Sequence, residues 1–272
     1  MNAAVMRTAS ADIGRLLPTT AANVTDQEIL EAYTAGTWHA GGKPWVRLNF
    51  VASVDGSATR DGRSGGLGTP ADSRVFDLLR LLADVILIGA GTVRAEGYGA
   101  MMLPASAVRW RRANGKTDHP ALAIVSGRLG LDAASPIFRA APLRPIVYTT
   151  AVSADKRNAL HAAADVIAVG DRMVDPRLLI ADLRERGHGV VHCEGGPTLA
   201  GQLVACGEVD ELCLTISPQI DAGPGGRVIA NPIPAPQGVR LAALHHSDST
   251  LLARYVRDRM PEAGPPPTDQ AS

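Results

Sequence analysis

The sequence predicts a three-layer α/β/α fold, with a mostly parallel central sheet and helices on both faces. Short apolar runs alternate with helical patterns along most of the chain, and this alternation is typical of parallel strands joined by crossover helices. The chain has 272 residues, of which 46% are hydrophobic. That is enough to bury one large core or two smaller ones, and one domain is the simpler expectation.

The chain divides into three expected parts. Residues 1–43 form an N-terminal extension with one short amphipathic stretch, 25–33, which opens with a capping pattern of Thr25 and Glu28. Residues 44–259 hold the main domain. Residues 260–272 contain four prolines and no apolar periodicity, so we expect a disordered tail.

Eight apolar runs bounded by Gly, Pro, Ser or Asp are typical of strands. They are 45–53, 85–88, 121–125, 145–148, 166–169, 190–193, 211–216 and 251–256. Two helices are indicated by their caps. The run from Thr69 to Asp72 is typical of a capping box, and Asp175 with Pro176 begins a second helix that Gly187 ends. Ligands of such sheets bind at the carboxyl ends of the strands.

Composition excludes several classes of function. Lys plus Arg equals Asp plus Glu at 27 each, so no overall field favours nucleic acid or an anionic membrane. Cys193, Cys206 and Cys213 form no C-x-x-C pair, so we expect reduced thiols and no metal. No apolar stretch reaches the roughly 20 residues of a membrane helix, and no secretory signal is visible. A cytoplasmic protein is expected.

The strongest local signal is the end of the strand 190–193. The strand runs through Gly195 and Gly196 directly into a helix that begins near Pro197. Free amides at a helix start, with glycines that admit a ligand to the backbone, suit an anion such as a diphosphate. The same pattern is also typical of a tight turn that binds nothing.

A second glycine-rich turn, 88–94, follows the strand 85–88. It matches the dinucleotide-binding fingerprint only in part, because Arg94 stands where the third glycine would be. Two glycine-rich strand ends in one sheet favour a single long ligand that carries phosphates.

Two further loops have competing interpretations. The run 62–66 contains the G-x-S-x-G pattern of hydrolases around Ser64, but the residues before it are polar, whereas a nucleophile elbow needs a buried strand there. A loop over a ligand is the better interpretation. Asp55 precedes Gly56 at a strand end. An Asp-Gly pair is primarily typical of a hairpin turn, and its position at the end of a strand leaves a functional role for Asp55 open.

Together these segments resemble the reductase domain of riboflavin biosynthesis, a family with the dihydrofolate-reductase-like fold. The matching pieces occur in the family's order within about residues 45 to 256: 52–56, 78–93, 194–201 and 209–212. The resemblance implies reduction of 5-amino-6-(5-phosphoribosylamino)uracil with NADPH by a homodimer. It also implies that the cofactor carries the difficult chemistry while the protein aligns it with the substrate.

The resemblance and the two glycine-rich turns assign roles to particular residues. The cofactor is expected along Ala52, Gly91, Thr92, Glu96, Ser126, Gly195, Gly196, Pro197, Thr198, Leu199, Ala200, Gly201 and Gln202. Arg94 and Arg128 each follow a strand end and are candidates for the 2′-phosphate of NADPH. Ser64, Arg80 and Glu194 are expected to face the substrate. Asp55 and Glu194 are the candidate catalytic carboxylates.

The sequence departs from the family in three places and leaves two alternatives open. Gly65 and Gly66 replace a frequent aromatic residue, Glu96 replaces an Asp, and the stretch 98–112 is unfamiliar, so no phosphate ligand is assigned there. The alternatives are a reductase of the same fold acting on a dihydropterin or dihydrofolate, and a non-catalytic nucleotide-binding regulator. The zinc deaminase signature is absent, so we expect a stand-alone reductase.

Overall fold

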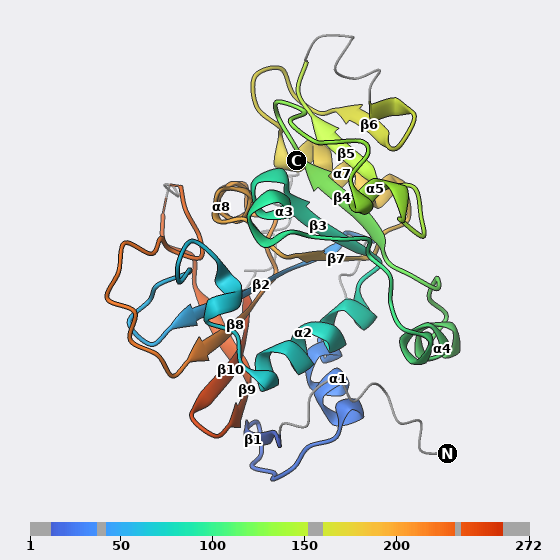
Figure 1. Cartoon of the computed structure of the whole chain (residues 1–272). Helices are drawn as coiled ribbons and strands as arrows, with labels where there is room; N and C mark the ends of the chain where they lie inside the picture. The colour runs from blue at the N-terminus through green and yellow to red at the C-terminus, as the bar shows by residue number, and fades with distance from the viewer. Residues whose placement is uncertain (1–11, 37–41, 152–159, 232–234, 258–272) are drawn as a thin grey trace, which may run out of the picture.

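The structure is a computed structural model that describes residues 12–36, 42–151, 160–231 and 235–257 (Figure 1). Its strands form one ten-stranded sheet. They are β1 (Gly14–Leu17), β2 (Trp45–Ser53), β3 (Val85–Gly89), β4 (Ala121–Val125), β5 (Ile146–Thr149), β6 (Asp165–Ala168), β7 (Val190–Cys193), β8 (Glu211–Ser217), β9 (Val239–Ser247) and β10 (Thr250–Arg257). The tail predicted at 260–272 lies outside the described residues.

The order of the strands is β1-β9-β10-β8-β2-β7-β3-β4-β5-β6. All pairs from β8 to β6 are parallel, and β1, β9, β10 and β8 pair in antiparallel fashion. This confirms the prediction of a mostly parallel sheet. Each of the eight predicted strands is present within one residue at either end, whereas β1 and β9 were not predicted.

Helices cover both faces of the sheet, as predicted. They are α1 (Asp26–Thr34), α2 (Pro70–Leu82), α3 (Ala90–Glu96), α4 (Ala105–Ala113), α5 (Pro136–Arg139), α7 (Pro176–Glu185) and α8 (Pro197–Ala205), with a short 3₁₀ turn, η1 (Ser64–Gly66). Helices α1 and α2 lie side by side (Figure 1). No helix among the described residues is both long and apolar enough to span a bilayer.

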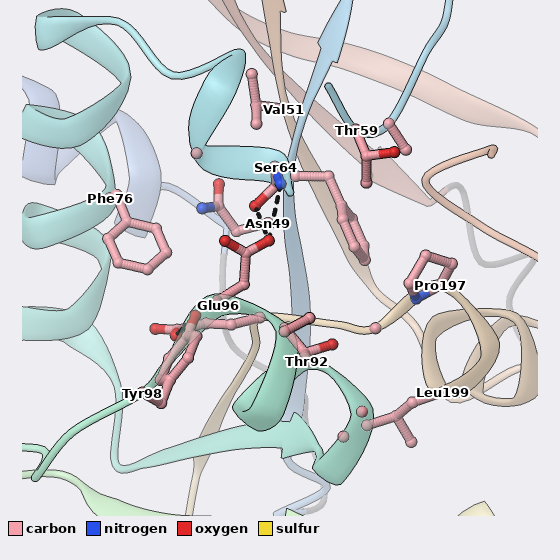
Figure 2. Close-up of a pocket in the computed structure, with 18 of the residues that line it drawn as sticks. Asn49, Val51, Thr59, Ser64, Phe76, Thr92, Glu96, Tyr98, Pro197 and Leu199 are labelled. Carbon is pink, nitrogen blue, oxygen red and sulfur yellow. Dashed lines mark hydrogen bonds between the residues drawn. The ribbon is translucent and has the colours of Figure 1, made fainter. Parts of the chain in front are cut away.

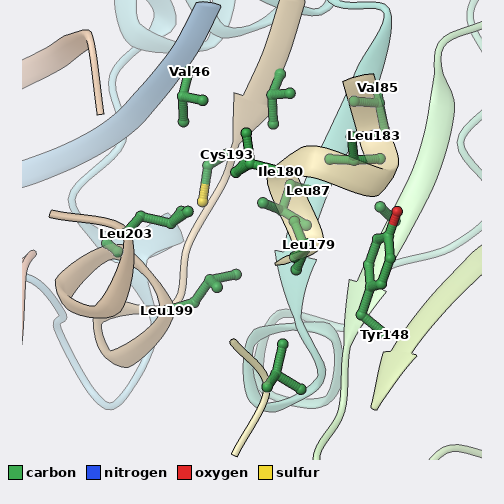
Figure 3. Packing of buried hydrophobic residues seen from close by; sticks show 14 of the residues in the cluster. Val46, Val85, Leu87, Tyr148, Leu179, Ile180, Leu183, Cys193, Leu199 and Leu203 are labelled. Atoms are coloured by element: carbon green, nitrogen blue, oxygen red, sulfur yellow. The ribbon is translucent and has the colours of Figure 1, made fainter. Parts of the chain in front are cut away.

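Strand β3 shows how the two layers share the core. Val85 and Leu87 belong to a buried cluster that includes Leu179 and Leu183 of α7 and Leu203 of α8 (Figure 3). The alternate residues Ile86 and Ile88 pack in a different cluster with side chains of α3 and α5. A strand covered on both faces has a continuous apolar sequence, which is why the run 85–88 predicted it.

The caps of α1 and α2 differ. The capping box of α1 is confirmed, because the Glu28 amide donates to Thr25 Oγ1 (3.2 Å) and the Thr25 amide donates to Glu28 Oε2 (2.8 Å). At α2 only half of the predicted box forms. The Asp72 amide donates to Thr69 Oγ1 (3.2 Å), but the Asp72 carboxylate accepts a hydrogen bond from another residue, the Thr215 hydroxyl of β8.

The described part of the N-terminal extension is integrated into the fold. Strand β1 pairs with β9, and α1 packs on α2. The main-chain carbonyl groups at the end of α1 accept hydrogen bonds from two arginines: Arg47 Nη2 reaches Tyr33 O (2.6 Å), and Arg254 Nη1 reaches Ala32 O (3.1 Å). Both guanidinium groups also bind the Glu211 carboxylate. Buried charges thus join this segment to β2, β8 and β10.

Candidate active site

A cavity of about 910 Å³ opens at the carboxyl ends of β3, β4 and β7 and runs beneath α2 (Figure 2). This volume is at the upper end of the range for small-molecule and cofactor sites. The position agrees with the expectation for parallel sheets. Of the predicted site residues, the following line it: Ser64, Arg80, Gly91, Thr92, Glu96, Glu194, Gly196, Pro197, Thr198, Leu199 and Gln202.

The two glycine-rich turns meet at this cavity. The Gly89 amide donates to Gly195 O (2.7 Å), and a Cβ added at Gly196 would lie 2.7 Å from Thr92 Oγ1. Gly195 has φ +93°, and a Cβ there would lie 3.0 Å from the Phe50 ring. Both positions therefore require glycine, one for the close approach of α3 and one for its backbone conformation.

The start of α8 presents free amides to the cavity. Gly196 is the N-cap and Pro197 follows it, so the first intrahelical bond is from the Ala200 amide to Gly196 O (3.0 Å). The amides of Thr198 and Leu199 precede that bond and lack helical acceptors, as the first amides of any helix do. Both residues line the cavity. These donors, with the positive end of the helix dipole, fit an anionic group.

The opposite wall is a stripe along α2. Asp72, Phe76 and Arg80 line the cavity, and their spacing of four residues places them on one face of the helix. The Arg80 guanidinium lies 4.1 Å from the centre of the Phe76 ring. It also binds Glu194 in bidentate fashion, with Nε to Oε1 at 2.6 Å and Nη2 to Oε2 at 2.7 Å.

Glu194 is held as a buried carboxylate. Burial alone would raise its pKa, but the Arg80 charge and hydrogen bonds more than offset burial, so the pKa is lowered. The Tyr98 hydroxyl donates to Glu194 Oε2 (2.8 Å), and burial, followed by this carboxylate, raises the pKa of Tyr98. Behind them, burial lowers the pKa of His192 to about 4. Near neutral pH, Glu194 is therefore ionised, and Tyr98 and His192 are neutral.

Ser64 of η1 and Glu96 of α3 both line the cavity and contact each other. The amide and the hydroxyl of Ser64 donate to Glu96 Oε1 at 2.7 Å and 2.9 Å (Figure 2). The sequence assigned Ser64 to the substrate and Glu96 to the cofactor. Their contact fastens the loop that carries η1 to the end of α3, over the cavity.

Several predicted site residues lie outside the cavity lining: Ala52, Asp55, Arg94, Ser126, Arg128, Gly195, Ala200 and Gly201. The Asp55 carboxylate accepts hydrogen bonds from the Ser53 hydroxyl and from the Asp221 and Ala222 amides. These bonds lower its pKa to about 2. Asp55 thus holds the turn after β2 against the loop after β8, a short distance along the chain from the cavity wall.

Arg94 lies in α3, after β3, and Arg128 lies in the loop after β4. Arg94 Nη1 donates to Gly130 O (3.0 Å), which ties the end of α3 to the loop that carries Arg128. Both side chains are exposed.

The lining residues that the sequence did not assign include Asn49, Asp72, Phe76 and Tyr98. The sequence did hold a signal for Asp72 and Phe76: they precede Arg80 by eight and four residues, a spacing that places all three on one face of a helix. Asp72 was instead interpreted as part of a helix cap. Tyr98 lies in the stretch that the resemblance did not match.

Comparison with known proteins agrees with this geometry. A 2,5-diamino-6-ribosylamino-4(3H)-pyrimidinone 5′-phosphate reductase of Aquifex aeolicus is 30% identical over 188 residues, 66% of this chain and 80% of the relative. The reductase of that name from Archaeoglobus fulgidus is 26% identical over 177 residues, 65% of this chain and 81% of the relative. Riboflavin biosynthesis protein RibD of Escherichia coli is 26% identical over 190 residues, 66% of this chain and 49% of that longer protein.

Solved structures share the fold. A pyrimidine reductase-like protein of Corynebacterium diphtheriae superposes with a TM-score of 0.76 at 27% identity, covering 87% of this chain and all of that one. A bifunctional deaminase/reductase of Thermotoga maritima superposes with a TM-score of 0.60 at 20% identity, covering 85% of this chain and 60% of that one.

The family model described as the RibD C-terminal domain matches residues 44–250. The match covers most of the predicted main domain, and the cavity lies within it. The chain therefore belongs to the RibD C-terminal domain family, the reductases of riboflavin biosynthesis, which have the dihydrofolate-reductase-like α/β fold.

Proposed function

We propose that this reductase uses NADPH to convert a 6-(5-phosphoribosylamino)pyrimidine of riboflavin biosynthesis into its ribityl form. The observation that carries the proposal is the division of one cavity into two walls. The glycine-rich turns and the start of α8 form one wall, and the stripe on α2 forms the other. Such a cavity suits a phosphate-bearing cofactor beside a second ligand.

The residues present fit a nicotinamide dinucleotide. The Thr198 and Leu199 amides suit the diphosphate, and the absence of a side chain at Gly196 allows close approach. Arg94 and Arg128 are the cations proposed for the 2′-phosphate, which distinguishes NADPH from NADH. When bound, the reduced nicotinamide supplies a hydride; the protein supplies position and charge.

The charge states limit what the two predicted carboxylates can do. The substrate's ribosylamine opens to an imine, its C1 carbon gains a hydride, and its nitrogen gains a proton. Glu194 and Asp55 have lowered pKa values, so at neutral pH neither is a proton donor. Glu194 is already paired with Arg80, so its proposed role is to help hold the substrate in position, and water supplies the proton.

A dihydropterin reductase is the second candidate function. The specific observation that favours it is the Asp72 carboxylate on the substrate wall, because a dihydropterin presents adjacent N–H groups on its pyrimidine ring. Cytoplasmic location and a homodimer belong to the same proposal. The free thiols of Cys193, Cys206 and Cys213 are consistent with a reducing compartment, and sedimentation of the purified protein tests the dimer.

A turnover assay tests the proposed function. The purified protein is given the phosphoribosylaminopyrimidine with NADPH or NADH, and the ribityl product is identified by mass spectrometry. We expect turnover and a preference for NADPH that falls in the Arg94→Ala, Arg128→Ala double variant. Arg139→Ala, an exposed arginine outside the cavity lining, is the control. Absence of turnover with either cofactor would contradict the proposed function.

A further inference from the structure

The described part of the N-terminal extension lies against the helix that forms the substrate wall. The family model matches from residue 44 onwards, so α1 and β1 precede the matched region. One side of α2 carries the stripe that lines the cavity, and its other side packs on α1 (Figure 1). The two helices share a buried cluster that includes Ile29, Leu30 and Tyr33 of α1 and Val75, Leu78, Leu79 and Leu82 of α2.

An ion pair binds the start of α1 to α2. Arg74 of α2 donates from Nε to Asp26 Oδ1 (2.7 Å), and its Nη2 lies 2.6 Å from the same oxygen. The two side chains are only 16% and 15% exposed, so solvent screens this pair less than it screens an exposed one. Arg74 lies between Asp72 and Phe76 in the sequence. The pair therefore fixes the part of α2 that carries the first half of the stripe.

The end of α1 is bound to the floor of the cavity. Arg47 of β2 donates to Tyr33 O (2.6 Å), and Arg254 of β10 donates to Ala35 O (3.0 Å). Asn49 follows Arg47 by two residues in β2, on the same face of the sheet, and lines the cavity. Helix α1 is thus bound at its start to the wall and at its end to the strand that forms the floor.

We propose that α1 is a spacer that sets the distance between the substrate wall and the floor of the cavity, and that Asp26 and Arg74 are its positioning residues. This inference rests on the proposed function, in which α2 is the substrate wall. Both residues lie outside the cavity lining, so they act through α2. A misplacement of about 1 Å at a reacting centre can cost on the order of 100-fold in rate, so a small shift of α2 is enough to matter.

Removal of either charge tests the spacer. Asp26→Asn and Arg74→Gln should each lower kcat/KM for the phosphoribosylaminopyrimidine on the order of tenfold, chiefly through a higher KM. NADPH affinity should stay unchanged, because other elements form the cofactor wall. The kinetics are measured well below the unfolding midpoint of each variant. A merely structural role would lower that midpoint and leave KM as in the wild type.

Conservative and paired changes check that the ion pair is responsible. Asp26→Glu keeps a carboxylate in the first turn of α1 and should retain most of the wild-type KM. Asp26→Asn combined with Arg74→Gln should show no further rise in KM beyond that of the worse single variant, since each single change already removes the pair. Asp165→Asn is the matched control. It breaks the ion pair with Arg144 (2.8 Å) in β6, at the opposite edge of the sheet from β1, and should leave KM unaltered.

Hydrogen–deuterium exchange of residues 70–82 separates this inference from the proposed function, because it needs no substrate. The amides of α2 should exchange faster in Asp26→Asn and in Arg74→Gln than in the wild type or in Asp165→Asn. Equal exchange in all four proteins, or an unchanged KM in the folded variants, overturns the inference. Absence of turnover in the wild type, with the difference in exchange present, contradicts only the proposed function.

Discussion

At the scale of single residues, the site depends on a pair of opposite charges. Arg80 lies within the apolar pattern of a helix, so the sequence predicts that its guanidinium either leaves the edge of the core or meets an anion. That anion is Glu194, and the guanidinium is committed to it by two hydrogen bonds. In the proposed function, Arg80 therefore acts chiefly by holding the Glu194 carboxylate and the Phe76 ring in place.

Arg80→Ala should lower kcat/KM by roughly ten- to a hundredfold, the equivalent of about 1.5–3 kcal/mol for a charge-assisted contact. NADPH affinity should change little, since the cofactor wall is separate. Because Arg80 and Glu194 act as a unit, Arg80→Ala with Glu194→Gln should cost little more than the worse single change. Steady-state kinetics of the three variants measure this. Costs that multiply would show that the residues act independently.

The sequence predicted some site residues and missed others for a physical reason. Gly196 was assigned because a strand, two glycines and a helix follow one another in the chain, and Glu194 was assigned through the resemblance to the family. Asp72 was missed because the direction of its side chain depends on which face of α2 covers the sheet. Tyr98 was missed because its position depends on the path of the chain after α3. Asp55 was predicted, but its carboxylate is used by the loop after β8.

At the scale of elements, the approach of α3 to α8 determines the cofactor wall. Gly196→Val should abolish NADPH binding, because even a Cβ would lie 2.7 Å from Thr92 Oγ1. Gly238→Ala, where an added Cβ meets nothing within 4 Å, should bind NADPH as the wild type does. Fluorescence titration measures both affinities, and thermal unfolding shows whether the folds persist. Unchanged affinity in a folded Gly196→Val would place the dinucleotide elsewhere.

Elements with apolar patterns were predictable, and elements ordered by polar contacts were not. The continuous apolar run of β3 was found at once. Helix α4 was missed because arginines interrupt its apolar pattern. One of them, Arg111, is fully buried and donates to Leu81 O (2.8 Å) and Ala83 O (2.6 Å) at the end of α2. A hydrogen-bonded arginine of this kind leaves no periodic signal in the sequence.

At the scale of the whole molecule, Glu211 joins segments from both ends of the chain. It is 1% exposed and binds Arg47 and Arg254, which are 1% and 2% exposed. Glu211→Gln would leave two buried cations with one neutral partner, which should cost about 3–5 kcal/mol of unfolding free energy. The midpoint of thermal unfolding should fall by roughly 6–20 °C. Exposed Glu185→Gln is the control.

Acid should destabilise the wild type through the same residue. Burial would raise the pKa of Glu211, but Arg47 and Arg254 lower it to about 2, against an ordinary value of 4.5. A lowered pKa stabilises the fold fully above pH 4.5, and this contribution is lost as the pH falls towards 2. Glu211→Gln should therefore lose less stability than the wild type between pH 4.5 and 2 in denaturant titrations. Equal losses would assign the acid sensitivity to other groups.

The Glu211 cluster also bears on how the protein forms during its synthesis. Its hydrogen bonds join residues 164 positions apart, from Arg47 to Glu211, and 222 apart, from Ala32 to Arg254. Contacts so distant in sequence form slowly, because the chain must close long loops before it gains their energy. A nascent chain on the ribosome therefore holds Arg47 without Glu211 until β8 emerges, and α1 without Arg254 until β10 emerges. The Glu211 cluster is thus completed only after β10 has been synthesised, and until then its buried charges depend on solvent or chaperones for protection.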